Sequence, residues 1–92
     1  MIPIKLIETY HDMYIYEIEF ESSTIYATSY TREVEEGELT KEKLNQLKVY
    51  ENADDFSERY SEYRMGITPN KENGIDERCK KMESRLLKSL EQ

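Results

Sequence analysis

The sequence contains few of the residues on which catalysis and metal binding usually depend. Its 92 residues include one cysteine, one histidine and three glycines. A single cysteine permits neither an internal disulfide nor a cysteine-rich zinc site, and a single histidine cannot provide several imidazole ligands. Three separated glycines do not make the loop that binds phosphates through backbone N–H groups. We therefore predict that the protein is not an enzyme and holds no metal or cofactor.

The lone histidine and the lone cysteine are interpreted as structural residues. His11 falls in a predicted hairpin loop, without the cleft and partner group that a general base needs. Cys79 shares an apolar helical stripe with Met82 and Leu86. A thiol in such a position packs as a small hydrophobic group, whereas a reactive thiolate needs access and a lowered pKa.

Long apolar runs are also missing. No stretch approaches the roughly 18 apolar residues of a membrane span, and the N-terminus lacks the basic and apolar regions of a signal peptide. The length suits one domain over residues 1–92, because two halves would each be too short to bury a core. These features predict a cytoplasmic, single-domain protein without a membrane partner.

Acidic side chains are what the sequence has in excess. Asp and Glu number 20 against 13 Lys and Arg, which gives a formal net charge of -7. The excess lies in the first two thirds of the chain, because residues 67–92 hold six basic and five acidic side chains. An acidic chain repels polyanions, so we do not expect general nucleic-acid binding.

Alternation of apolar and polar residues predicts strands within residues 2–31. Tyr16, Ile18 and Phe20 alternate with Glu17 and Glu19, and a period of two is the pattern of a half-buried strand. We expect a three-stranded antiparallel meander with one apolar face and one face that carries glutamates and tyrosines.

The predicted pairing follows from keeping apolar residues on one face. A turn at residues 22–23 pairs Phe20 with Ile25. For the first hairpin, a three-residue loop at 11–13 keeps Ile4 and Leu6 on the apolar face, whereas a two-residue turn would set them opposite glutamates. A slip of one residue inverts every side chain, so the three-residue loop is preferred.

Helical spacing follows over residues 41–90. The first helix is predicted to start after Thr40 and to direct residues as far as Tyr50 inward; the second starts within 52–54, and the third starts near Asp76. Ser, Thr, Asn and Asp favour helix starts because their side chains accept backbone N–H groups. The fold class is therefore α+β, with about three helices packed on one face of the meander.

Three groups of acidic residues form candidate binding surfaces. Carboxylates four residues apart on a helix or two apart on a strand are separated by about 6 Å, which is comparable with the spacing of nucleic-acid phosphates. Acidic faces also keep small proteins soluble, and that alternative stays open. We name the groups the sheet row (Glu17, Glu19, Glu21), the acidic segment (Glu33, Glu35, Glu36 and Glu38, within residues 33–38) and the helical row (Asp54, Glu58, Glu62).

Tyrosines add to the candidate surface. Tyr26 and Tyr30 are predicted on the outer face of the sheet beside the glutamates. Exposed tyrosines are common anchors in protein interfaces because they bury much area at low entropy cost. Packing between strands, or burial beneath another part of the chain, is the alternative.

Together these features favour a small binding protein that inhibits a nucleic-acid-processing protein by occupying its basic groove. In size and acidity the chain resembles phage-encoded DNA-mimic inhibitors, including some anti-CRISPR and anti-restriction proteins, and the resemblance implies a phage or mobile-element origin. The expected partner is a larger protein with a basic nucleic-acid-binding surface. Two alternatives stay open: a homodimeric structural or regulatory module, and a weak nucleic-acid binder that uses the basic residues Arg78, Lys80, Lys81, Arg85 and Lys88.

Overall fold

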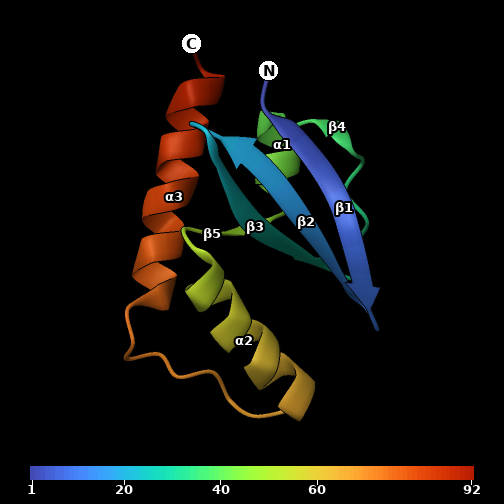
Figure 1. Cartoon of the computed structure of the whole chain (residues 1–92), viewed down its shortest axis with the longest axis vertical. Coiled ribbons are helices and arrows are strands. Elements are labelled where there is room, and N and C mark those ends of the chain that lie inside the picture. The colour runs from blue at the N-terminus through green and yellow to red at the C-terminus, as the bar shows by residue number, and fades with distance from the viewer.

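A five-stranded antiparallel sheet and three helices make up the computed structural model, which describes all 92 residues (Figure 1). The order across the sheet is β4-β1-β2-β3-β5. The α+β class and the meander of three consecutive strands are confirmed, and one short strand is added at each edge. The elements are β1 (Pro3–Tyr10), β2 (Met13–Phe20), β3 (Ser23–Tyr30), β4 (Gly37–Glu38), α1 (Lys41–Leu44), β5 (Lys48–Tyr50), α2 (Ala53–Met65) and α3 (Ile75–Leu90).

The first hairpin has a two-residue turn at residues 11–12, so the predicted three-residue loop is wrong. If the register set by this turn continued, Leu6 would leave the apolar face. Ile7 is instead an extra residue, and beyond it Leu6 pairs with Tyr16. A β-bulge of this kind shifts the pairing by one residue. The bulge at Ile7 therefore restores the apolar face that the sequence pattern requires.

The second hairpin turns one residue earlier than predicted. Phe20 pairs with Ser23, and Ile18 pairs with Ile25. The register differs from the prediction by two residues, so each side chain keeps its predicted face. The turn residues Glu21 and Ser22 have φ angles of 51° and 63°, and positive φ at both central positions is what a type I′ turn requires.

The predicted first helix is mostly wrong. Thr40 accepts a hydrogen bond from the Lys43 N–H and caps α1, but the helix ends at Leu44. Lys48–Tyr50 forms β5, which pairs with β3. Val49 and Tyr50 are consecutive residues that are both buried. A strand covered on both faces accommodates such a pair, whereas the spacing of apolar residues alone also fitted a helix.

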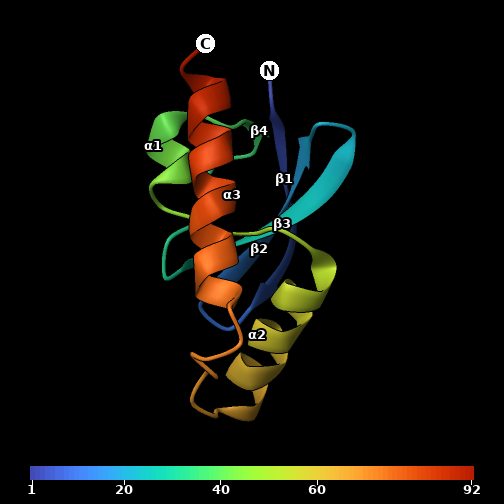
Figure 2. The ribbon, with the colours of Figure 1, turned by 90° about the vertical axis from the view of Figure 1, so that its left-hand side faces the viewer.

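The helices cover both faces of the sheet, which corrects the prediction of a single helical layer. Ala27 lies in the main core with Met82 and Leu86 of α3. Tyr26, its neighbour on β3, points to the opposite face and stacks on Phe56 of α2. Figure 2 shows α1 beside the C-terminal half of α3 and α2 near the other end of α3.

The starts and ends of α2 and α3 agree with the sequence prediction. The Asn52 side chain accepts the Asp55 N–H at the start of α2, and Gly66 ends this helix with a φ of 69°. The buried stripe of α3 contains Cys79, Met82 and Leu86. None of the three helices combines the length and apolarity needed to cross a membrane.

Candidate interaction surfaces

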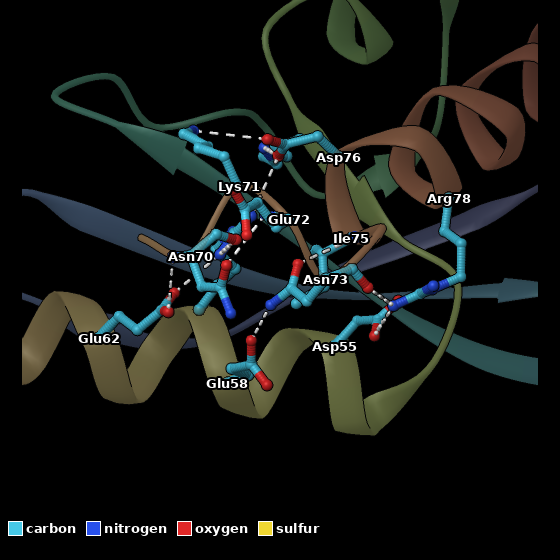
Figure 3. Close-up of polar contacts among 12 residues, drawn as sticks. Asp55, Glu58, Glu62, Asn70, Lys71, Glu72, Asn73, Ile75, Asp76 and Arg78 are labelled. Carbon is cyan, nitrogen blue, oxygen red and sulfur yellow. Dashed lines mark hydrogen bonds and ion pairs between the residues drawn. The ribbon is translucent and has the colours of Figure 1, made fainter. Parts of the chain in front are cut away.

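The helical row does not face solvent as a unit. Glu62 is 8% exposed, and its carboxylate accepts hydrogen bonds from Arg59 Nη1 at 2.9 Å and from the Asn70 N–H at 3.0 Å. Glu58 accepts a hydrogen bond from the Asn73 side chain. Asp54 and Glu58 are both exposed and have no ion pair, but only Asp54 also accepts no side-chain hydrogen bond. Glu58 and Glu62 therefore hold the loop between α2 and α3 in place (Figure 3).

The sheet row is also divided by the fold. Glu17 is half-buried between Lys5 and Tyr26 on the neighbouring strands. Glu19 is exposed and accepts a hydrogen bond from Thr24 Oγ1 at 2.7 Å. Glu21 lies in the turn and forms an ion pair with Arg85 of α3. The three glutamates therefore do not form one row of free carboxylates.

The acidic segment is the group whose carboxylates all stay exposed without an ion pair. This holds for Glu33, Glu35, Glu36 and Glu38. The first three of them line a shallow hollow that opens to solvent. Lys43 Nζ donates to the backbone oxygen of Glu38 at 2.7 Å and forms no ion pair with its carboxylate. The carboxylates of this segment are therefore available to another molecule.

Buried residues fix the acidic segment to the body of the protein. Val34 is 2% exposed, and its N–H donates to Tyr16 Oη at 2.6 Å. Leu39, at the other end of the segment, is 1% exposed. Glu36 Oε1 accepts the Leu6 N–H at 2.8 Å, beside the bulge in β1. These anchors hold the carboxylates on a rigid scaffold, which lowers the ordering cost of binding.

The tyrosines predicted at the outer face are largely covered by α2. The rings of Tyr26 and Phe56 are stacked, with centroids 5.1 Å apart, and Tyr26 is half-buried. Tyr30 keeps 46% exposure and contacts Tyr63 with ring centroids 5.5 Å apart. Tyr26 lies on the predicted outer face, and the alternative of burial beneath another part of the chain applies to it, because the aromatic stripe of α2 packs there.

Further tyrosines meet at the end of the β1–β2 hairpin. Arg64 lies 5.2 Å from the centroid of the Tyr10 ring and 5.6 Å from that of the Tyr60 ring. The Tyr60 hydroxyl donates to Glu8 at 2.6 Å. The Tyr63 hydroxyl donates to Asp12, and this carboxylate raises the pKa of Tyr63 to about 12. These contacts attach α2 to the hairpin.

A network of ions joins α2, β5 and α3, and the sequence analysis did not identify it. Asp76 accepts a hydrogen bond from Lys48 Nζ at 2.6 Å and lies 3.5 Å from Arg59 Nη2. The Lys48 contact lowers the pKa of Asp76 to about 2. Nearby, Arg78 makes two hydrogen bonds with Asp55, at 2.7 and 2.9 Å (Figure 3). The partners are 17 to 28 residues apart in the sequence, so no local pattern indicates these pairs.

The outward side of α3 forms a second, oppositely charged surface. Arg85 contacts Glu21, whereas Lys80, Lys81 and Lys88 make no ion pair within 4.0 Å. An open hollow on this helix is lined by Lys80, Lys81, Ser84, Arg85 and Lys88. We call these five residues the basic face of α3.

Cys79 is not placed as a reactive thiol, and the acidic residues form no metal-holding cluster. Cys79 is buried, and burial raises the pKa of its thiol to about 11. No three His, Cys, Asp or Glu side chains are grouped so that they would hold a metal ion. Comparison with protein-family models, with curated proteins and with solved structures finds no match.

Proposed function

We propose that this protein binds a larger nucleic-acid-processing protein and inhibits it by occupying its basic groove with the acidic segment. The observation that carries the proposal is that the four carboxylates of residues 33–38 are exposed and have no ion pair. The segment is irregular, with a bend at Glu36 and strand only at Gly37–Glu38, and it gathers four like charges within six residues. Such a cluster suits a groove whose cationic side chains bind successive phosphates.

The contrast with the other acidic groups supports this choice. In each of the other two candidate groups, one carboxylate is paired internally: Glu21 with Arg85 in the sheet row and Glu62 with Arg59 in the helical row. In the acidic segment the chain leaves like charges close together, which is unfavourable for the isolated protein. Of the three acidic groups, we therefore propose only the acidic segment as the contact surface.

Electrostatics would contribute mainly to the rate and specificity of such binding. Complementary charge steers two proteins together and accelerates association, while exposed charge pairs are weakened by salt. We therefore expect partner affinity to fall between about 50 mM and about 200 mM salt. An affinity that does not change with salt would contradict the proposed mechanism.

The test compares two neutralised variants of equal net charge. The first replaces all four glutamates of the acidic segment with glutamine. The control carries Glu51→Gln, Asp54→Asn, Glu72→Gln and Glu77→Gln, which are exposed positions without ion pairs. Each protein is used to capture partners from a bacterial lysate, and a captured DNA-binding protein is then titrated with each variant.

The proposal predicts at least a tenfold weaker affinity for the segment variant and little change for the control. DNA must also compete with the wild-type protein for the partner, and partner activity must fall as the complex forms. Equal binding by the two variants would exclude the acidic segment as the contact surface. Capture of a partner that DNA does not displace would exclude occupation of a nucleic-acid groove.

A further inference from the structure

The basic face of α3 is exposed, and Arg85 is the one charged residue in it that is paired within the chain, with Glu21. Its free lysines are Lys80, Lys81 and Lys88. Along the helix axis, Lys80 and Lys88 are about 12 Å apart. The face therefore presents a short cationic strip of defined length.

The acidic segment lies on the opposite flank of the molecule. It leads into β4, which is one edge of the sheet, whereas α3 lies beside β5, the other edge (Figure 1). The two surfaces therefore cannot meet within one copy of the chain. Glu33 and Glu38 are five residues apart, so their Cα atoms are separated by at most about 17 Å, and the bend at Glu36 shortens this distance. The segment is therefore of similar length to the basic strip.

We propose that the basic face of α3 docks the acidic segment of a second copy of this chain. The carboxylates of the segment are complementary to the three free lysines, whereas Arg85 is already paired with Glu21. A short segment needs to contact only the basic strip. A second copy also has a net charge of -7, so long-range repulsion opposes both occupants. A long nucleic acid would in addition extend beyond the strip, whereas the segment of a second copy is about as long as the strip.

The geometry of this contact is head to tail. Because the two surfaces differ, each docked pair keeps one free acidic segment and one free basic face, so copies can add to either end. The association is held by exposed charges, and we expect it to be weak, dependent on concentration and sensitive to salt. If the proposed function also holds, copies in such an assembly have their partner-binding segment covered.

The test measures the mass of the purified protein by sedimentation, from micromolar to millimolar concentration, at about 20 mM and about 300 mM salt. At low salt, the average mass should rise from the monomer value of 11.0 kDa to at least twice that value. At high salt it should return to the monomer value, because screening weakens exposed ion pairs. A monomer under all conditions would overturn the proposal.

Paired charge reversals identify the surfaces. One variant carries Glu33→Lys, Glu35→Lys and Glu38→Lys; the other carries Lys80→Glu, Lys81→Glu and Lys88→Glu. Each variant alone should stay monomeric, and an equimolar mixture should associate again, because each basic surface then meets an acidic one. Both variants remain negatively charged overall, so their net charges cannot drive this recovery. Circular dichroism checks that both fold.

A control reversal and a nucleic-acid titration complete the design. Glu51→Lys, Glu72→Lys and Glu77→Lys change the net charge as much as the segment reversal does, and this variant should still associate. Failure of the mixture to associate would overturn the proposal. A second result would also overturn it: the wild-type protein binds a DNA oligonucleotide at low salt, and the α3 reversal abolishes this DNA binding but leaves self-association of the variant intact. None of these measurements needs the larger partner, so they are independent of the proposed function.

Discussion

The buried side chain of Arg59 is held by partners that include residues distant in the sequence. It is 7% exposed, its Nη1 donates to Glu62 and to the backbone oxygen of Asn70, and its Nη2 lies near Asp76. Buried charges are tolerated only when they are paired and hydrogen-bonded. These contacts fix the loop between α2 and α3, and with it the position of α3.

Stability at acid pH should report on this network through Asp76. The hydrogen bond from Lys48 holds the pKa of Asp76 at about 2, below the value near 4 of an unfolded chain. A depressed folded-state pKa contributes stability above pH 4, and that contribution is lost as the pH falls through 2. The shift corresponds to about 2 kcal/mol. The pKa of Asp55 is also lowered, chiefly by its hydrogen bond with Arg78, and acts in the same direction.

We therefore expect the free energy of unfolding, measured by urea denaturation, to fall between pH 4 and pH 2. The fall should be shallower in Asp76→Asn, which has lost the titrating group, and this variant should be less stable than the wild type at pH 7. Glu77→Gln is the matched control, because Glu77 is exposed and has no ion pair. Equal slopes for Asp76→Asn and the wild type would contradict the assignment.

The helical row illustrates why residue roles were harder to predict than the helix that carries them. Spacing at i, i+4 and i+8 correctly placed Asp54, Glu58 and Glu62 on α2. It could not show that Asn70 and Asn73 of the next loop donate hydrogen bonds to two of these carboxylates. Side-chain pairing across the fold depends on loop conformation, which no periodic pattern specifies.

At the scale of elements, the sequence pattern predicted correctly which face of each strand is buried, but it predicted both hairpin turns at the wrong positions. Alternation fixed the faces of Ile4, Ile18 and Phe20, and all three are buried in the main core. The predicted loop was wrong because an extra residue that keeps the apolar side chains on one face can lie either in the turn or in a bulge within the strand. In this protein the extra residue is Ile7, within β1.

Deletion of Ile7 should therefore be tolerated. Removing the bulge residue joins the two parts of β1 in a continuous ladder and leaves the Leu6–Tyr16 pair unchanged. Deletion of Lys5 would instead turn Ile4, which is 3% exposed, away from the core. We expect the free energy of unfolding to fall by less than about 1 kcal/mol for the first deletion and by about 2 kcal/mol or more for the second.

Chemical denaturation of the two deletion variants checks this contrast, since both remove one residue from the same strand. If deletion of Ile7 lowered the free energy of unfolding as much as deletion of Lys5, the bulge would have a structural role besides setting the register. The hydrogen bond from the Leu6 N–H to Glu36 would then be the first contact to examine.

Over the whole molecule, charge is separated into two surfaces on opposite flanks of the sheet. The net charge was evident from the sequence, but its distribution was not. Arg85 and Arg59 neutralise Glu21 and Glu62, which belong to the other two acidic groups. The acidic segment on one flank and three lysines of α3 on the other are clusters of like charge without ion pairs. The fold thus distinguishes the three acidic groups by their internal contacts, which composition alone could not do.

If the acidic segment is kept for binding, its carboxylates should not be needed for folding. We expect Glu33→Gln, Glu35→Gln and Glu38→Gln together to raise the free energy of unfolding by less than about 1 kcal/mol at low salt, because repulsion between exposed like charges is removed. Glu36 is left intact because it accepts the Leu6 N–H. The difference from the wild type should disappear in about 1 M salt, where the Debye length is near 3 Å. A destabilised variant would mean that these carboxylates support the fold, and a loss of partner binding on their removal would then be structural in origin.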